Sequence, residues 1–218
     1  MGKTILTPNQ KLLLDEVANS RVLTNSFYLT GGTALSEFYL NHRLSEDLDF
    51  FTENELNEVE IAAWVKTIAQ KTATNVEFET LRGQLIYYFK FPKDTVKIEF
   101  AYFPFPVLGS YLRYKTLKVS SLEDIAVNKL QTILTRSRSR DYFDLFEILK
   151  REKLSIEKVG RDYRLKFDVF IPDEELARRF TAVLDAKDQP KFLKKVAWEK
   201  VVNFFLSEAK KLESKILK

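Results

Sequence analysis

The sequence predicts an α+β fold in which a mixed β-sheet domain comes first and a helical domain follows. Three strand-like runs succeed one another between residues 75 and 103, and the pattern becomes helical from Ser121 onward. With 218 residues, 45% of them hydrophobic, the chain can bury a sizeable core. We therefore expect two domains, residues 1–110 and residues 111–218, joined near the proline-containing stretch at residues 104–120.

In the first half, a short aromatic run is stopped by two glycines, which indicates a strand that turns into a helix at Thr33. Further on, acids and apolar residues alternate with a period of two, which predicts a strand with Asp47 and Asp49 on one face. The elements expected before residue 72 are helices at 9–19, 33–41 and about 54–71, and strands at 27–30 and 46–51.

The next three runs are each bounded by turn residues, so they predict an antiparallel meander. After Ser121 only one segment, residues 165–172, looks extended. The meander strands are expected at residues 75–82, 84–91 and 95–103, and the first two helices of the second half at 121–134 and 140–150.

The composition excludes several kinds of protein. Without cysteine, disulfides and thiolate metal sites are excluded. No apolar run approaches the roughly 18 residues that a membrane span needs, and the N-terminus has no basic-then-apolar signal pattern. The only histidine, His42, disfavours a zinc site, and neither the nucleophile-elbow nor the P-loop signature occurs. We expect a soluble, cytoplasmic protein that has no membrane partner.

The net charge of +4 hides an asymmetry between the halves. Residues 1–110 carry 10 lysines and arginines against 14 acids, and residues 111–218 carry 25 against 17. An acidic half with clustered aspartates beside a basic half suits a polyanion held over metal ions. Solvated, lysine-rich helix faces explain the same charges equally well.

Two motifs of the first half point to phosphate chemistry. A glycine pair at 31 and 32 that opens a helix leaves backbone N–H groups accessible to an anion. The carboxylates of Asp47 and Asp49 project from one strand face about 7 Å apart, and their hard oxygens suit Mg²⁺. Each motif alone also fits an ordinary turn or a polar strand face. Because aspartate is a poor strand former, two of them in an apolar strand favour a functional role.

Three more residues extend the candidate site. Glu99 would complete a metal site if its strand neighbours the Asp-x-Asp strand, and an exposed Lys97–Glu99 charge pair is the alternative. Lys129 falls on the apolar stripe of its helix, so it either snorkels to solvent or reaches toward bound phosphate. Asp141 begins the next helix, where an acid is favoured by the helix dipole in any case.

The stretch LTGGTALSEFYLNHRLSEDLDFF, residues 29–51, resembles the opening motif of the nucleotidyltransferase-like toxins of the AbiEii/AbiGii abortive-infection, or type IV toxin–antitoxin, family. The run VKIEFAYF at 96–103 is similar to the strand that bears the third carboxylate of that superfamily. Residues 121–149 resemble its lysine-containing helix and the Arg-Asp-x-x-Asp-Leu helix that follows. Together these matches fall within residues 27–150.

The resemblance implies a DNA polymerase β-like nucleotidyltransferase core, Mg²⁺ with Mn²⁺ as the alternative metal, an NTP donor, and a toxin opposed by a cognate antitoxin protein. Glu99 departs from the aspartate that is more usual at its position, although glutamate can also ligate a metal. The residues carried over by position are Gly31, Gly32, Thr33, Arg43, Ser45 and Lys129 for the nucleotide, Asp47, Asp49 and Glu99 for the metal and catalysis, and Lys129 and Asp141 for catalysis.

The expected reaction is metal-dependent transfer of a nucleoside monophosphate to an acceptor hydroxyl, with release of pyrophosphate. The basic second half favours RNA, most plausibly a tRNA 3′ end, as the acceptor. Protein adenylylation and a non-catalytic nucleotide- or partner-binding module are the alternatives, and a metal-dependent nuclease ranks last. Asp141 either orients Lys129 or accepts the proton of the acceptor.

Overall fold

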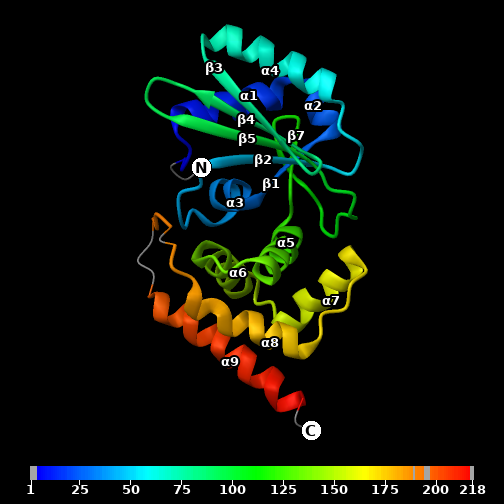
Figure 1. Cartoon of the computed structure of the whole chain (residues 1–218), viewed down its shortest axis with the longest axis vertical. Helices are drawn as coiled ribbons and strands as arrows, with labels where there is room; N and C mark the ends of the chain where they lie inside the picture. The colour runs from blue at the N-terminus through cyan, green and yellow to red at the C-terminus, as the bar shows by residue number, and fades with distance from the viewer. Residues whose placement is uncertain (1–3, 189, 194–196, 217–218) are drawn as a thin grey trace. The chain divides into compact units, whose positions relative to one another are not determined.

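The computed structural model describes residues 4–188, 190–193 and 197–216, and it divides into two compact units (Figure 1). Unit 1 comprises Met1–Pro106 and Ser110–Ser121, and unit 2 comprises Val107–Gly109 and Leu122–Lys218. The sequence placed the division after residue 110. The structure continues unit 1 to Ser121, because the residues just beyond 110 add two short strands to the sheet.

This boundary reduces the charge asymmetry that the sequence suggested. Counted by unit, lysines and arginines number 13 against 14 acids in unit 1, and 22 against 17 in unit 2. Three basic residues, Arg113, Lys115 and Lys118, lie on or beside the added strands and so belong to unit 1. Unit 2 remains basic, and unit 1 is close to neutral.

Unit 1 is built on one seven-stranded mixed sheet with the order β3-β4-β5-β2-β1-β7-β6. The pairs β2–β5 and β1–β7 are parallel, and the other pairs are antiparallel. The α+β class with a mixed sheet is therefore as predicted. The strands are β1 Tyr28–Thr30, β2 Asp47–Thr52, β3 Asn75–Leu81, β4 Gln84–Lys90, β5 Thr95–Tyr102, β6 Leu112–Tyr114 and β7 Leu117–Val119.

The predicted meander is confirmed by β3, β4 and β5, whose bounds lie within a residue of those expected. Strands β6 and β7 were missed, since each has only three residues and they lie in a stretch that reads as a linker. After the meander, the chain crosses over so that β7 pairs with β1 on the side opposite β2. Strand β1 therefore lies between β2 and β7 and is buried throughout.

The strand β2 alternates between buried and half-exposed residues, as its period of two predicts. Its buried apolar side chains, Leu48 and Phe50, share a face with Ile98 and Phe100 of β5. The rings of Phe50 and Phe100 stack with centroids 5.5 Å apart, and Trp64 meets Phe100 edge-on at 6.1 Å. Three helices lie on this face of the sheet: α1 Pro8–Asn19, α2 Arg21–Ser26 and α4 Glu58–Thr72 (Figure 1).

The glycine pair begins a helix on the opposite face of the sheet, but this helix is short. Helix α3 spans Gly31–Leu35 and passes into a π-helical turn over Ser36–Leu40. Asn41 ends the turn in the left-handed conformation, with φ of 46°. With only five α-helical residues, α3 contributes little dipole, so any anion binding here depends on the backbone N–H groups and nearby cations.

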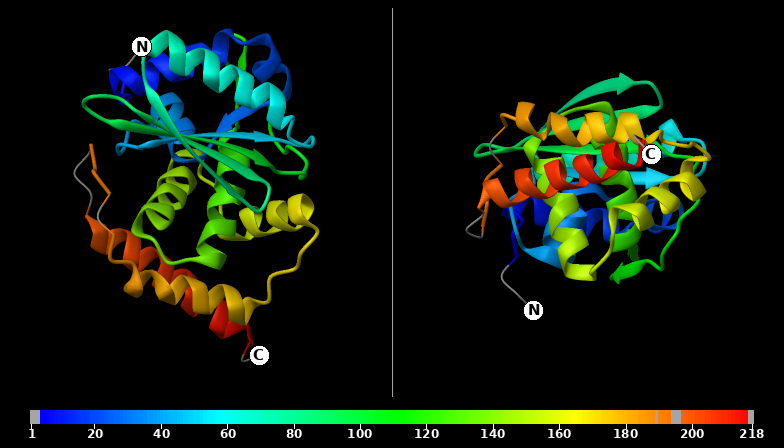
Figure 2. Two further views of the ribbon diagram at one scale, coloured as in Figure 1. Left: turned by 45° about the horizontal axis from the view of Figure 1, so that its top comes forward. Right: turned by 90° about the horizontal axis from the view of Figure 1, so that it is seen from below.

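Unit 2 contains helices and no strand among its described residues. Helices α8 and α9 run side by side (Figure 2), and Phe205 of α9 packs against Tyr142 and Phe180 at 5.0 and 5.3 Å. The described helices of this unit are α5 Leu122–Thr135, α6 Ser139–Glu152, α7 Ile156–Phe167, α8 Asp173–Thr181, a 3₁₀ turn Ala182–Asp185 and α9 Trp198–Ile216.

The extended segment predicted over residues 165–172 is wrong. Its first three residues finish α7, and Asp168 ends that helix in the left-handed conformation with φ of 52°. The apolar residues that suggested a strand, Leu165, Val169 and Phe170, are exposed by 71%, 48% and 67%. Among the described residues, none of the helices is both long and apolar enough to cross a lipid bilayer.

Candidate active site

The two glycines of the first motif lie against one of the predicted acids, Asp49, and against the predicted cation, Arg43. Gly31 has φ of 72°, and a Cβ on it would overlap the carboxylate of Asp49. A Cβ on Gly32 would overlap the guanidinium of Arg43 and lie 2.8 Å from Ser45 Oγ. A side chain at either position would therefore force a neighbouring side chain to move, and position 31 favours glycine for its conformation as well.

The chain around these glycines is held by side chains that fix the following loop. Thr33 is fully buried, and its hydroxyl donates a hydrogen bond to the carbonyl of Asp47. Gln10 donates from Nε2 to the carbonyls of Ser45 and Glu46 at 2.8 and 2.9 Å. Arg43, only 4% exposed, donates to the carbonyl of Leu44 at 2.8 Å. The loop that carries the cation is thus tied to both the first helix and the first motif.

The acids of β2 face charged residues of β5 in register. Asp49 is paired with Glu99, and Asp47 is paired with Lys97. Residues paired across adjacent strands point to the same face, about 4.8 Å apart at the backbone. The structure therefore meets the condition under which the sequence placed Glu99 at the site, because its strand neighbours the Asp-x-Asp strand.

Lys97 lies among these carboxylates. Its Nζ is 2.9 Å from Glu99 Oε2 and 3.8 Å from Asp47 Oδ2. Burial acts to lower the pKa of Lys97, but the hydrogen bond to Glu99 and the negative charges of Glu99, Asp47 and Asp49 outweigh it and raise that pKa. The alternative that the sequence left open, a Lys97–Glu99 pair, is present, and it forms inside the acidic cluster with Glu99 only 12% exposed.

The donor set fits a hard divalent cation. In the part of the chain that the structure describes, no three carboxylates or histidines converge into a complete metal cage. Mg²⁺ in phosphoryl-transfer sites is usually held by one or two carboxylates together with substrate phosphates, so two aspartates suffice on the protein side. Thr30, in register with Asp49, adds a buried hydroxyl that finds no hydrogen-bond partner among the described residues.

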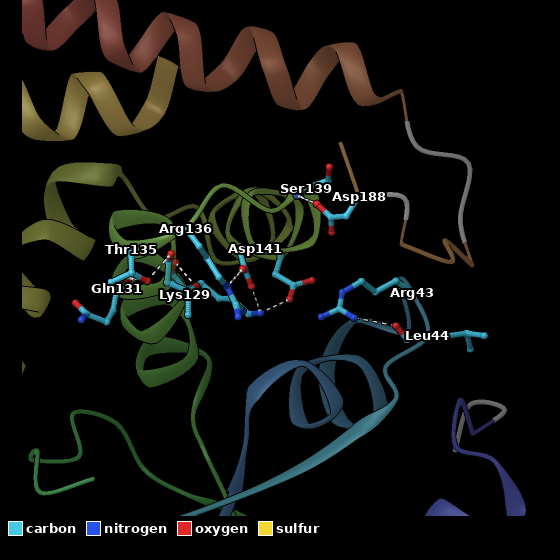
Figure 3. A network of polar contacts seen from close by, with 11 residues as sticks. Arg43, Leu44, Lys129, Gln131, Thr135, Arg136, Ser139, Asp141 and Asp188 are labelled. Carbon is cyan, nitrogen blue, oxygen red and sulfur yellow. Dashed lines mark hydrogen bonds and ion pairs between the residues drawn. The ribbon is translucent and has the colours of Figure 1, made fainter. Parts of the chain in front are cut away.

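The two later candidates lie in unit 2, where they form a buried ionic cluster (Figure 3). Lys129 Nζ is 2.9 Å from Asp141 Oδ1 and 2.7 Å from Asp144 Oδ2, and both aspartates are fully buried. Arg136 donates from Nε to the second oxygen of Asp141 at 2.9 Å. Burial acts to raise the pKa of Asp141, but Lys129 and Arg136 overcome it and hold that pKa below its usual value. The ammonium group of Lys129 therefore does not extend to solvent and is paired with two buried aspartates.

Unit 2 contains a second buried ion pair that no sequence pattern indicates. Lys166 Nζ lies 2.6 Å from Asp124 Oδ1, with the two side chains 1% and 3% exposed. Asp124 also accepts backbone N–H bonds from Leu108 and Gly109 at 3.0 to 3.3 Å. This carboxylate explains why residues 107–109 belong to unit 2 although the chain on either side of them belongs to unit 1.

Comparison with known proteins decides the family. Residues 12–213 match the family described as nucleotidyl transferase AbiEii toxin, type IV TA system. The chain belongs to the AbiEii family. This match spans most of the chain, so it covers both units and confirms the resemblance that the sequence motifs indicated. The AbiEii-family chain is a nucleotidyltransferase, and its family comprises toxins of type IV toxin–antitoxin systems.

Individual relatives of this AbiEii-family chain are distant. An uncharacterized protein of Aquifex aeolicus (strain VF5) is 25% identical over 209 residues, which are 94% of this chain and 96% of that protein. The structure of JHP933 from Helicobacter pylori has a TM-score of 0.58 at 20% identity, covering 95% of this chain and 91% of JHP933. The nucleotidyltransferase toxin MenT4 from Mycobacterium tuberculosis H37Rv has a TM-score of 0.51 at 16% identity, covering 91% and 82%. These structures share the fold.

The structure of the AbiEii-family chain brings the predicted site residues together in two groups, one in each unit. The first group holds the glycine motif, its cation and the acids; the second holds the lysine and aspartate of the later motifs. The neighbouring residues Lys97, Thr30 and Asp144 were not predicted as site residues. The members of the two groups are Gly31, Gly32, Thr33, Arg43, Ser45, Asp47, Asp49 and Glu99 in unit 1, and Lys129 and Asp141 in unit 2.

Proposed function

We propose that this AbiEii-family protein is an Mg²⁺-dependent toxin that transfers a nucleoside monophosphate from an NTP to a hydroxyl of RNA, at a tRNA 3′ end, in the cytoplasm. Mn²⁺ is the alternative metal. The observation that carries the proposal is the contact of the glycine pair with both the acid and the cation of the motif: Gly31 with Asp49, and Gly32 with Arg43. A triphosphate over the glycines would meet a metal ligand on one side and a guanidinium on the other.

The triphosphate would be bound by backbone N–H groups and side-chain donors that lie at the glycine pair. Backbone N–H groups at Gly31 and Gly32 can approach phosphate oxygens closely because no Cβ intervenes. Arg43 and Ser45 lie against Gly32 and supply a charged and a neutral donor. Thr33 contributes by fixing the carbonyl of Asp47 and, with it, the start of the acidic strand. Such preorganised donors stabilise the charge that develops on the leaving pyrophosphate.

Asp47 and Asp49 would hold the divalent ion, which when bound polarises the α-phosphate and offsets the charge of the polyphosphate. The acceptor oxygen forms a bond to the α-phosphorus, while the bond from that phosphorus to the α,β-bridging oxygen breaks. Pyrophosphate leaves with the electron pair, and the hydroxyl proton passes to solvent. Glu99, in register with Asp49, belongs to the acidic face on which the acceptor is expected.

Lys129 and Asp141 belong to the proposal through the family motif that they match. Asp141 has both carboxylate oxygens engaged, one by Lys129 and one by Arg136, and its pKa is lowered. A carboxylate with these properties is a weak base. We therefore assign Asp141 to orienting Lys129 and not to accepting a proton.

The RNA acceptor is supported by the basic charge of unit 2, which carries 22 lysines and arginines against 17 acids. Fewer basic side chains are available to bind RNA than the charge count indicates, because Lys129 and Arg136 are paired with buried aspartates. Arg138 and Arg140 of the same segment remain as candidates for phosphate contacts. The family also implies a cognate antitoxin, which we expect to be a protein that opposes the toxin.

The test is transfer of label from each α-³²P-labelled NTP, in turn, to total tRNA in the presence of Mg²⁺. Purified native protein is compared with the double variant Asp47→Ala/Asp49→Ala, and products are separated on a denaturing gel. Label on tRNA that requires both aspartates and Mg²⁺ supports the proposal and identifies the nucleotide.

Two other outcomes separate the competing functions. Label that travels with protein when a cell extract replaces tRNA would favour adenylylation of a protein and overturn the RNA acceptor. Retention of NTP without turnover on any RNA or protein pool would favour a non-catalytic nucleotide-binding module. Label on tRNA that persists in the double variant would remove the aspartates from the site.

A further inference from the structure

The feature that the proposed function leaves unexplained is a lysine in the middle of the acidic site. Lys97 shares its sheet face with Asp47, Asp49 and Glu99, since β2 and β5 pair in register. Its ammonium group is within 2.9 Å of Glu99 and 3.8 Å of Asp47. A cation-binding site of three acids would ordinarily exclude a neighbouring lysine, because the two positive charges would repel.

The arrangement differs from that of an ordinary surface ion pair on the same sheet. Lys90 and Glu77 also pair at 2.9 Å, but their side chains are 40% and 68% exposed. Lys97 and Glu99 are 25% and 12% exposed, so their pair is substantially removed from water. Pairs that are exposed contribute little, whereas a partly buried pair is screened less and holds its geometry.

The charges of the cluster balance one divalent ion. Three carboxylates and one ammonium carry a net charge of −2, which a single Mg²⁺ or Mn²⁺ neutralises. Lys97 donates a hydrogen bond to the Glu99 carboxylate at 2.9 Å, whereas its Nζ lies 3.8 Å from Asp47 Oδ2. The pairing therefore divides the cluster into two parts: Asp47 and Asp49, which follow the glycine motif, and Glu99 with its lysine.

We propose that the Lys97 ammonium takes the place of a second divalent ion, so that this nucleotidyltransferase binds one divalent ion at Asp47 and Asp49 while Glu99 binds Lys97. The inference rests on the proposed function, since it presumes that the two aspartates hold a metal with the nucleotide. It replaces the expectation from the sequence that Glu99 is a third metal ligand, and it differs from the two-metal arrangement that is common in phosphoryl transfer. Lys97 is thus a resident cation whose charge is present before any substrate binds.

The test counts ions in the bound complex and does not depend on turnover. Purified full-length protein is equilibrated by dialysis with Mn²⁺ and the α,β-methylene analogue of each ribonucleoside triphosphate, whose α,β linkage cannot be broken by transfer. Retained Mn²⁺ and retained analogue are both measured. We expect one Mn²⁺ per bound analogue in the native protein and two in Lys97→Met, because Glu99 is then released to act as a ligand.

Two matched variants exclude simpler explanations. Lys90→Met removes a lysine from the same sheet face and should keep the ratio at one, which separates the effect from a general loss of positive charge. Lys97→Met/Glu99→Gln should return the ratio to one, because the second ion needs the carboxylate. Circular dichroism checks that each variant is folded, and Lys97→Gln serves in place of Lys97→Met if the latter does not fold.

The outcomes distinguish this inference from the proposed function. A ratio of two in the native protein, or a ratio of one in folded Lys97→Met and Lys97→Gln, would overturn the role of Lys97 and leave nucleotidyl transfer standing. Failure of the native protein to retain any analogue with Mn²⁺ would overturn the proposed metal and nucleotide site, and the inference with it.

Discussion

The carboxylate of Asp49 occupies the space that a Cβ on Gly31 would take. Gly31 is the first residue of α3, directly after β1, and Asp49 lies in β2. The glycine motif and the acidic motif are therefore in direct contact, although 18 positions separate the two residues in the sequence. Any side chain at position 31 must displace the acid that we assign to the metal. In the proposed function, this contact would link nucleotide binding and metal binding through one short piece of backbone.

Gly31→Ala is expected to lower transfer activity by about 100-fold, the scale of loss that follows a displacement of about 1 Å in a catalytic group. It should also cost about 1–2 kcal/mol of stability, because alanine is strained at a φ of 72°. Activity is measured by labelling of tRNA, and stability by urea unfolding.

Gly83→Ala is the matched control for this variant. Gly83 has a φ of 80°, but a Cβ there would meet nothing closer than Tyr102 Cβ at 3.9 Å. Gly83→Ala should therefore lose a similar free energy of unfolding and keep its activity. Equal activity losses in the two variants would mean that backbone strain, and not displacement of Asp49, accounts for the effect.

Lys129→Met is expected to destabilise the protein by about 3–5 kcal/mol, which is the usual consequence of removing one partner from a buried ion pair. The reason is that Asp141 and Asp144, both fully buried, lose the ammonium that lies within 2.9 Å of each. Chemical unfolding followed by circular dichroism measures the change. Adding Asp144→Asn to this variant should recover part of the loss by removing one of the buried charges.

The partly exposed pair of Lys158 and Asp162 supplies the comparison for that measurement. Its atoms are 2.7 Å apart, but its side chains are 38% and 18% exposed, and such pairs contribute about 0–1 kcal/mol. Lys158→Met should therefore change stability far less than Lys129→Met. If the two losses are equal, burial does not set the energy of the Lys129 cluster.

Much of unit 1 could be predicted because its patterns are local. The alternation in β2 identified the face of Asp47 and Asp49, and the turn residues around the meander gave β3, β4 and β5. The family motifs supplied the residues that we propose for the site. The placement of Glu99 at the site depends on β2 and β5 being neighbours in the sheet. This relation arises from a crossover that no local pattern encodes, so the sequence predicts it only conditionally.

The ionic partners could not be predicted, for a related physical reason. A lysine on an apolar stripe signals that a buried charge must be paired, but not which acid pairs with it. Lys129 finds Asp144 on the next helix, and Lys166 finds Asp124 at a separation of 42 residues. Lys166 lies near the end of α7, in a segment whose alternation predicts a strand. Because residues 165–172 were wrongly predicted to be extended, the burial of Lys166 could not be predicted either.

The contribution of Asp141 to stability should depend on pH in one direction. Its pKa in the folded protein lies below the usual 3.8, owing to Lys129 and Arg136, so between these two values the unfolded chain binds more protons than the folded one. The stabilisation is therefore complete above pH 3.8 and is lost as the pH falls through the folded pKa.

Comparison of the native protein with Asp141→Asn, by urea unfolding at a series of pH values, measures this dependence. The difference in free energy of unfolding should be constant between about pH 5 and pH 7, and should shrink as the solution is acidified below about pH 4. A difference that grows on acidification would show that the carboxylate is not held in its charged form by its two cations.

Gly32→Ala tests the nucleotide cradle without backbone strain, since a Cβ at this position would overlap Arg43 and lie 2.8 Å from Ser45 Oγ. Displacing Arg43 removes a charge-assisted hydrogen bond to phosphate, which is worth about 1.5–3 kcal/mol, so the KM for NTP should rise roughly 10- to 100-fold.

Gly160→Ala is the control: its Cβ would enter open space within α7, and it should raise stability by about 0.5–1 kcal/mol with KM unchanged. A rise in KM for both variants would point to a general effect of substitution, whereas a rise confined to Gly32→Ala places the triphosphate beside Arg43.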